Sequence, residues 1–353
     1  MLGPQPQHPG TVASWPEKER RAEPCPGEAV PGAPRRAGAT QVTSGPGRSD
    51  EGARVAQGRM HADERVVDAA VVRGLVADQL PRWAHLPVVH ASSSGTDNAM
   101  FRLGDDLAVR LPRIERAVAQ VEHEQRWLPL LGPALPVETP VPVALGAPGA
   151  GFPWPWSVYT WVEGAPPEPA DLTERFVLDL AECLAVLHAL DLPGGPPEHR
   201  GLTFGPRDAV TRESIAAMRG MPGIDTDAVT AVWDAVADLP TCAPPGTWVH
   251  GDVAPGNLLV RGGRLAGLID FGGVGIGDPA VDVQVAWNLL PRSLRPVLRE
   301  ALGVDDATWL RSRAWALSQA CLQLPYYVGT NRPLAANARY VIGEVLADAA
   351  AHD

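Results

Sequence analysis

Residues 250–257 read His-Gly-Asp-Val-Ala-Pro-Gly-Asn, and residues 269–272 read Ile-Asp-Phe-Gly. Two short apolar runs, Asn257–Val260 and Leu265–Asp270, lie between them and are joined by Arg261-Gly262-Gly263-Arg264, a pattern that predicts a β-hairpin. Taken singly, the aspartates and the asparagine have ordinary explanations, because both residue types are common in turns and caps. The order and spacing of Asp252, Asn257 and Asp270 taken together are too specific for these ordinary explanations and indicate a shared chemical role.

An aspartate, an asparagine five positions later, a hairpin and then Asp-Phe-Gly is the arrangement that the kinase fold uses for phosphoryl transfer. Transfer to a hydroxyl needs a carboxylate beside that hydroxyl, so Asp252 is the expected catalytic residue, which orients the hydroxyl and accepts its proton. Mg²⁺ prefers oxygen ligands. We expect Asn257 and Asp270 to be the metal ligands, with the phosphates of ATP completing the shell, because the hairpin returns Asp270 to Asn257.

At these residues the chain resembles the aminoglycoside phosphotransferase family of small-molecule kinases, and the resemblance covers residues 60–353. Its motifs in this sequence are SSSGTDNAMFRLGDDLAVRLPR, EQRWLPLL, LAVLHALD, HGDVAPGNLLV and IDFGGVGIGDPAVD. The resemblance implies an α+β, bilobal protein-kinase-like fold with a small β-rich N-lobe and a larger, mainly helical C-lobe. It also implies ATP- and Mg²⁺-dependent transfer of phosphate to a hydroxyl of a small molecule, with antibiotic resistance as one role.

Two departures separate the sequence from protein kinases. Gly251 stands where those enzymes have the arginine that reads a phosphorylated activation loop, and His-Gly-Asp is typical of the resembled family. Only a few residues separate Asp270 from Asp278, and no Ala-Pro-Glu closes an activation segment. A protein substrate is therefore not expected. Asp278 and Asp282 flank a predicted helix start, where acids are favoured, so we interpret both as structural.

The nucleotide loop is expected at Ser92–Asn98, between the first two predicted strands, with Ser94 and Gly95 as nucleotide contacts. Arg110, in Leu-Ala-Val-Arg-Leu-Pro, stands where most kinases of this fold have a lysine, and it is similar to the RLPR variant of macrolide phosphotransferases. A guanidinium can hold two phosphate oxygens, so the role can survive the exchange. The alternative is that Arg110 is a solvated strand residue.

The expected partner of Arg110 follows from helical periodicity. Glu124 falls within a row of core-facing positions, which are 117, 121, 124, 128 and 131. A carboxylate on a core face needs a cation, and Arg110 is the natural one. The competing possibility is that Glu124 pairs only with Arg113 or Arg116.

The segment Tyr159–Glu163 matches the family's hinge, whose backbone groups hold the adenine, so Tyr159, Trp161 and Glu163 are further expected nucleotide contacts. We expect His250 to hold the catalytic loop by hydrogen bonds, and His188 to be a hydrogen-bonded core histidine rather than a ligand. Two tryptophans and two tyrosines are equally compatible with a substrate cleft or with core packing: Trp309, Trp315, Tyr326 and Tyr327.

Hydrophobic periodicity predicts the remaining elements. Strands are expected at Pro87–Ala91, Ala99–Leu103, Leu107–Leu111, Val141–Leu145 and Trp156–Val162. Helices are expected at about 64–80, 114–131, 171–190, 209–219, 226–238, 279–290, 306–324 and 333–350. These elements divide the chain into a nucleotide-binding N-lobe at 60–163 and a helical C-lobe at 164–353, which would carry the catalytic loop and the substrate cleft.

Residues 1–59 form a separate zone, rich in proline and glycine and poor in large apolar residues. Such a composition is typical of disorder, because too little apolar surface can be buried to offset the ordering entropy. Met60 opens a segment of helical periodicity, so we expect translation to start at Met60 and interpret residues 1–59 as a disordered tail that is a mis-called extension. An alternative is a tail that recruits a partner.

The composition of the chain argues against several partners and cellular settings. The net charge of −11 argues against nucleic acid or an anionic membrane surface as the main partner, and no apolar run is long enough to span a bilayer. Four widely spaced cysteines predict neither a zinc cluster nor a disulfide framework and favour a reducing, cytoplasmic setting. The chain has a single lysine, Lys18, among its 30 basic residues.

Two questions stay open at this point. The alternative function is a nucleotide-binding pseudokinase that serves as a regulatory or binding module, supported by the missing lysine and opposed by the intact Asp252, Asn257 and Asp270. The acceptor is the second open question, because an aminoglycoside, a macrolide and a metabolic hydroxyl compound all fit. The sequence sets neither the oligomeric state nor the choice between ATP and GTP.

Overall fold

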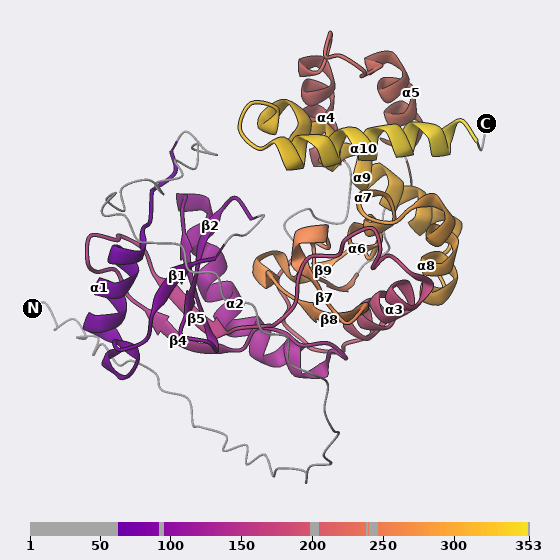
Figure 1. The fold of residues 1–353 in the computed structure, drawn as a ribbon. Helices are drawn as coiled ribbons and strands as arrows, with labels where there is room; N and C mark the ends of the chain where they lie inside the picture. Colours follow the sequence, from indigo (N-terminus) through magenta and orange to yellow (C-terminus); the bar gives the residue numbers. More distant parts are fainter. Residues whose placement is uncertain (1–62, 92–94, 198–204, 238, 240–245, 352–353) are drawn as a thin grey trace, which may run out of the picture. The chain divides into compact units, whose positions relative to one another are not determined.

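The computed structural model describes residues 63–91, 95–197, 205–237, 239 and 246–351, and all of them belong to one unit (Figure 1). Three sequence-based predictions lie outside these residues: the tail at 1–59, the start at Met60 and the nucleotide contact of Ser94. Within the described residues, no helix is both long and apolar enough to cross a membrane.

A five-stranded antiparallel sheet fills the N-terminal part, in the strand order β1-β2-β3-β5-β4. Its strands are β1 (Val88–His90), β2 (Asn98–Leu103), β3 (Leu107–Pro112), β4 (Pro142–Gly146) and β5 (Trp156–Thr160). Each coincides with a predicted strand to within a few residues. Short apolar runs bounded by turn residues account for the agreement, and along β3 and β5 the burial is nearly continuous.

The two faces of this sheet have different neighbours. On one face, Val109 and Leu111 of β3 belong to a buried apolar cluster with helix α1 (Ala69–Gln79). Because side chains alternate along a strand, Arg110 points to the opposite face. Helix α2 (Val118–Leu131) supplies Glu124 to that face, which places a charged pair where the sheet meets the helix.

The C-terminal part is mainly helical and is built around one large apolar cluster. Its helices are α3 (Glu174–His188), α4 (Gly205–Ala217), α5 (Thr226–Ala237), α6 (Ala280–Val283), α7 (Val285–Asn288), α8 (Arg295–Leu302), α9 (Asp306–Tyr327) and α10 (Arg332–Ala349). Figure 1 shows α10 running alongside α9, in agreement with the contacts between them. The α+β architecture expected from the sequence, with a β-sheet N-terminal part and a mainly helical C-terminal part, is therefore confirmed.

The predicted hairpin is present as β7 (Leu258–Arg261) paired with β8 (Arg264–Leu268). Its two central residues, Gly262 and Gly263, have φ of 63° and 72°. A two-residue turn that requires positive φ at both positions is the tight hairpin connection that matches strand twist. The turn is what returns the chain after Asn257 to the neighbourhood of its starting point.

Several elements were not predicted. Strands β6 (Thr247–Val249) and β9 (Gly275–Gly277) pair with each other although each has only three residues and β9 is rich in glycine. Helix α8 was missed because its buried residues are only Arg295 and Leu298, too few for a readable stripe. The single helix predicted at 279–290 is two short helices, α6 and α7, and α9 continues through Pro325 to Tyr327.

Candidate active site

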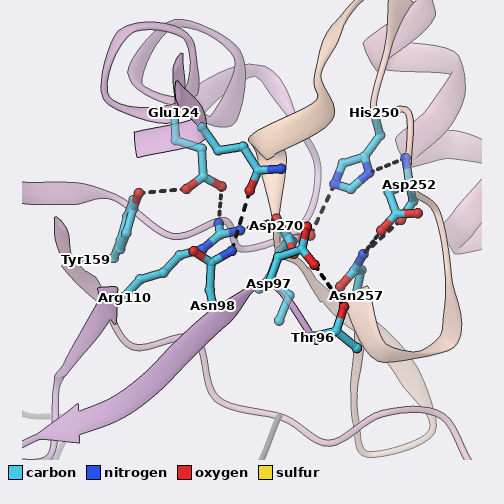
Figure 2. Close-up of polar contacts among 12 residues, drawn as sticks. Thr96, Asp97, Asn98, Arg110, Glu124, Tyr159, His250, Asp252, Asn257 and Asp270 are labelled. Atoms are coloured by element: carbon cyan, nitrogen blue, oxygen red, sulfur yellow. Dashed lines mark hydrogen bonds and ion pairs between the residues drawn. The ribbon is translucent and has the colours of Figure 1, made fainter. Parts of the chain in front are cut away.

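The loop at residues 250–257, which carries the expected catalytic residue Asp252 and is called the catalytic loop below, begins where β6 ends, and Asn257 fixes it. The side-chain Nδ2 of Asn257 donates to the backbone carbonyl of Asp252 at 2.9 Å and to Oδ2 of Asp252 at 3.0 Å. Figure 2 shows the two side chains facing each other. Because the amide nitrogen is used in this way, the loop conformation and the carboxylate orientation of Asp252 are set together.

Asp270 lies next to this loop because Ile269 N–H donates to the carbonyl of Asn257 at 3.0 Å. Asp270 has φ of 66°, in the left-handed region that aspartate tolerates better than most residues. Its Oδ1 accepts from Arg110 Nη2 at 2.6 Å. Burial raises the pKa of Asp270, but the Arg110 charge and hydrogen bond outweigh it and hold that pKa below its usual value.

Arg110 and Glu124 form the ion pair that helical periodicity predicts. Arg110 Nη1 donates to Glu124 Oε1 at 2.5 Å, and the two residues are 8% and 2% exposed. The Tyr159 hydroxyl donates to the other Glu124 oxygen at 2.7 Å. Burial disfavours the charge of Arg110, but Asp270 and Glu124 outweigh it and raise its pKa, so the guanidinium stays charged.

The alternatives considered for these residues are wrong. Arg110 is buried rather than solvated, and Arg116 pairs with Asp97 at 3.2 Å instead of Glu124. Figure 2 shows that side chains of β3, α2 and the Asp270 segment meet at the Arg110 guanidinium. Arg110 therefore joins two carboxylates that lie 146 positions apart in the chain, Glu124 and Asp270.

A buried carboxylate holds the start of the catalytic loop. Asp282 is fully buried and accepts from the backbone N–H groups of His250 and Gly251 at 2.9 Å each, and from His188 Nε2 at 3.0 Å. Burial raises the pKa of Asp282, but the hydrogen bond from His188 and the nearby histidines outweigh it and lower that pKa below its usual value. The sequence interpretation as a structural residue is correct, although its cause is loop anchoring rather than helix capping.

The two histidines have the structural roles expected of them. His250 Nε2 donates to the carbonyl of Ile269 at 3.1 Å, and its ring packs edge-on against Phe271 at a centroid distance of 4.8 Å. His188 is hydrogen-bonded to Asp282. Through His250 the catalytic loop is tied to the Asp-Phe-Gly segment. Asp278, which precedes Asp282 in the segment 277–282, is 1% exposed and pairs with Arg311 at 2.7 Å.

The described part of the expected nucleotide loop contacts the end of helix α9. Gly95 is exposed, whereas the Thr96 hydroxyl lies 3.2 Å from the Tyr327 hydroxyl and donates to Asp97 Oδ1 at 3.0 Å. Tyr326 packs edge-on against Tyr327 and is 49% exposed. Sequence reasoning missed this contact, which joins residues 231 positions apart. Of the aromatic residues left open between cleft and core, Trp315 is in the core.

Replacing Tyr327 by phenylalanine is expected to loosen the nucleotide loop. One neutral hydrogen bond contributes about 1 kcal/mol, so the amides of residues 95–98 should exchange with deuterium about five times faster. Hydrogen–deuterium exchange followed by mass spectrometry measures this directly. Tyr340→Phe, a change at a surface tyrosine that is 41% exposed, is the matched control. Unchanged exchange in the Tyr327 variant would mean that the contact does not hold the loop.

The segment expected to hold adenine has partners within the chain. Tyr159 lies in β5 and its hydroxyl donates to Glu124, while the backbone N–H of Trp161 donates to the carbonyl of Asp106 at 2.7 Å. Glu163 accepts from Arg102 Nη2 at 2.5 Å. Adenine contacts by these three residues stay a prediction. Such contacts would use backbone N–H and carbonyl groups other than the Trp161 N–H, which already donates to Asp106.

The two expected ligands of a cation, Asn257 and Asp270, are not part of a larger cluster of ligating side chains in the described part of the chain. Within the described residues, no three histidine, cysteine or acidic side chains are grouped so that they could hold a metal ion. Asn257 and Asp270, one amide and one carboxylate, fit the pattern of Mg²⁺ sites in which substrate phosphates and water supply the other ligands. The donor set therefore fits a magnesium–nucleotide complex better than a cation held by the protein alone.

Comparisons with known proteins agree with this geometry. The model of the phosphotransferase enzyme family matches residues 88–315, more than half of the chain. An aminoglycoside 3'-phosphotransferase of Escherichia coli is 41% identical over 71 residues, which are 20% of this chain and 26% of that protein. The chain thus aligns with about a quarter of the length of this curated relative.

Two solved structures share the fold. The GDP complex of wild-type aminoglycoside 2'-phosphotransferase-IIIa superposes with a TM-score of 0.62 at 20% identity, over 78% of this chain and 97% of that one. Macrolide 2'-phosphotransferase type I superposes with a TM-score of 0.54 at 20% identity, over the same shares of the two chains. At this identity the likeness concerns the fold, and it confirms the protein-kinase-like fold predicted from the sequence.

Proposed function

Because this chain belongs to the phosphotransferase enzyme family, we propose that it transfers the terminal phosphate of ATP to a hydroxyl group of a small molecule. The observation that carries the proposal is one linked set of polar side chains. Asn257 binds Asp252, the Asn257 carbonyl holds the segment that bears Asp270, and Asp270 binds Arg110, which binds Glu124 (Figure 2). The set offers a carboxylate to serve as the base, two oxygen donors for a cation and a positive charge for the phosphates, which are groups that phosphoryl transfer in this fold uses.

Asp252 orients the acceptor hydroxyl and accepts its proton. As the hydroxyl oxygen bonds to the terminal phosphorus, the bond from that phosphorus to the bridging oxygen breaks, and ADP leaves with the electron pair. Asn257 supports this role because its amide holds one carboxylate oxygen of Asp252 at 3.0 Å. Arg110 contributes a fixed positive charge to the phosphates, held in place by Glu124.

Asn257 and Asp270 would hold Mg²⁺ through their side-chain oxygens. When bound with the nucleotide, the cation neutralises phosphate charge. Asn257 suits this because its Nδ2 is committed to Asp252, which leaves its amide oxygen as the ligand atom. The lowered pKa of Asp270 suits it as well, because the carboxylate is ionised at neutral pH.

The acceptor is proposed only as a small hydroxyl compound. Many carboxylates of the helical part are already paired with arginines: Asp179 with Arg264, Asp208 and Asp234 with Arg212, Asp278 with Arg311, Glu344 with Arg295, and Asp348 with Arg313. An acidic surface available to a polycation is therefore smaller than the composition suggests. Aminoglycosides, macrolides and neutral hydroxyl metabolites all belong in the test.

The reaction is proposed for the cytoplasm. Cys183 and Cys321 are buried free thiols, and burial raises the pKa of each to about 12. Buried, protonated thiols are unreactive, and free thiols are typical of proteins in a reducing compartment such as the cytoplasm.

Incubation of the full chain with Mg·ATP and an acceptor panel tests the function. Mass spectrometry should find one acceptor heavier by a phosphate, with ADP formed in equal amount. Addition of EDTA in excess over Mg²⁺ is expected to abolish the product. ATP binding without any phosphorylated product across the panel, and without ADP formation, would count against the proposed transfer.

A further inference from the structure

Arg110 presents more donors than the two carboxylates can use. A guanidinium has five N–H groups in a rigid fork, whereas the lysine more usual at this position has one terminal nitrogen. Glu124 accepts from Nη1 and Asp270 accepts from Nη2, which leaves Nε on the side of the fork that neither carboxylate reaches. A donor buried at this depth costs free energy unless an acceptor meets it.

Asn98 lies on that side. It is the first residue of β2, directly after the described part of the nucleotide loop, and it is only 7% exposed. Figure 2 shows its side chain against the Arg110 guanidinium. In one orientation of the amide, Asn98 Nδ2 makes a long hydrogen bond of 3.4 Å to Gln120 Oε1 and faces the arginine donors without accepting from them. Exchange of the amide oxygen and nitrogen places an acceptor against those donors. In that orientation Asn98 Oδ1 accepts from Arg110 Nε at 3.2 Å and from Nη2 at 2.8 Å.

We propose that Asn98 is a positioning residue, which sets the rotation of the planar Arg110 guanidinium about the side-chain axis. This orientation lets arginine bind the nucleotide phosphates at a position where a lysine is usual. The inference rests on the proposed function. With Asn98, three acceptors on different sides of the fork define one orientation of a planar group. A lysine has a carbon at the Nε position, so the hydrogen bond from Nε to Asn98 Oδ1 would be absent. Asn98 and Arg110 are thus a matched pair.

A double-mutant cycle on nucleotide affinity tests this pairing. The dissociation constant of Mg·ATP is measured by calorimetry for the full chain, Asn98→Ala, Arg110→Lys and the double variant. In the presence of Arg110, Asn98→Ala is expected to weaken binding about tenfold, as for a hydrogen bond to a charged group. In the Arg110→Lys background the same change is expected to weaken binding less than about twofold. Asn337 on α10 donates its side-chain amide to the Asn288 carbonyl at the end of α7, and Asn337→Ala is the matched control, which should leave binding unchanged.

A spectroscopic readout separates positioning from general stability. With arginine labelled by nitrogen-15, the Nε–H signal of Arg110, assigned by its loss in Arg110→Lys, should exchange slowly with water in the unmodified chain. It is expected to exchange at least about tenfold faster in Asn98→Ala, with the melting temperature recorded alongside. This measurement needs neither nucleotide nor acceptor.

The outcomes distinguish the inference from the proposed function. Equal losses of affinity in both backgrounds, or an unchanged Nε–H signal in a folded Asn98→Ala chain, would overturn the pairing alone. Absence of Mg·ATP binding by the unmodified chain would overturn the proposed function and the inference with it. A loss confined to the Arg110 background, together with faster Nε–H exchange, supports the pairing.

Discussion

Asp252→Asn is expected to lower the turnover number by about a thousandfold while the dissociation constant of Mg·ATP changes less than about threefold. Asparagine keeps the size of the side chain but cannot accept the hydroxyl proton, and acid–base catalysis of this kind contributes about 10²–10⁴ in rate. Nucleotide affinity should survive because Asp252 is neither an expected ligand of the cation nor a partner of Arg110.

The experiment measures phosphorylated product by mass spectrometry and nucleotide binding by calorimetry on the same preparations. Asp191→Asn, a change at an exposed aspartate that follows α3, is the control for loss of one negative charge and should leave turnover unchanged. Turnover by the Asp252 variant close to that of the unmodified chain would remove Asp252 from the proposed catalytic role. Nucleotide binding by the unmodified chain with no turnover would favour the binding-module alternative.

Asp282→Ala is expected to lower the free energy of unfolding by about 3–5 kcal/mol. The carboxylate is fully buried, and its loss leaves the N–H groups of His250 and Gly251 and the His188 ring without their acceptor. Removing one partner from a buried polar set costs this much because the remaining groups stay desolvated. Urea unfolding followed by tryptophan fluorescence measures the loss.

Asp234→Ala is the matched control, because Asp234 pairs with Arg212 at 2.7 Å but its side chain is 54% exposed. An exposed pair contributes about 0–1 kcal/mol. The comparison also has a pH signature. Since the folded protein holds the pKa of Asp282 below the ordinary value of 3.8, its contribution is complete above that pH and is lost as pH falls through the folded pKa. A loss below about 1 kcal/mol at neutral pH would contradict the anchoring role.

Contacts that the sequence predicts are those with a local rule behind them. Glu124 lies on a helix, so its core-facing position can be counted from its neighbours, and Arg110 is then the cation that alternation on β3 places opposite. The hairpin turn at Gly262 and Gly263 likewise carries its own conformational requirement. In each case the deciding information lies within a few residues.

Contacts that the sequence did not predict depend on tertiary packing. Nothing near Thr96 or Tyr327 indicates that their hydroxyls meet, because the contact depends on where a long helix ends relative to a distant loop. The pairing of β6 with β9 is similar, since two three-residue runs have no readable alternation and gain their stability from each other. Asn98 lies in the stretch that also contains Arg110, but its hydrogen bonds to the guanidinium follow only from the orientation of Arg110 in the fold.

The buried guanidinium of Arg110 also decides which chemical probes can report on this site. Nucleotide analogues that carry an acylating group label kinases by reacting with an amine in the phosphate site. Arg110 is a poor nucleophile because Asp270 and Glu124, despite its burial, raise its pKa and keep it protonated. The one lysine in the chain, Lys18, lies outside the described residues. Amine-directed profiling should therefore leave the Arg110 site unlabelled, and reversible nucleotide competition is the better way to detect its occupancy.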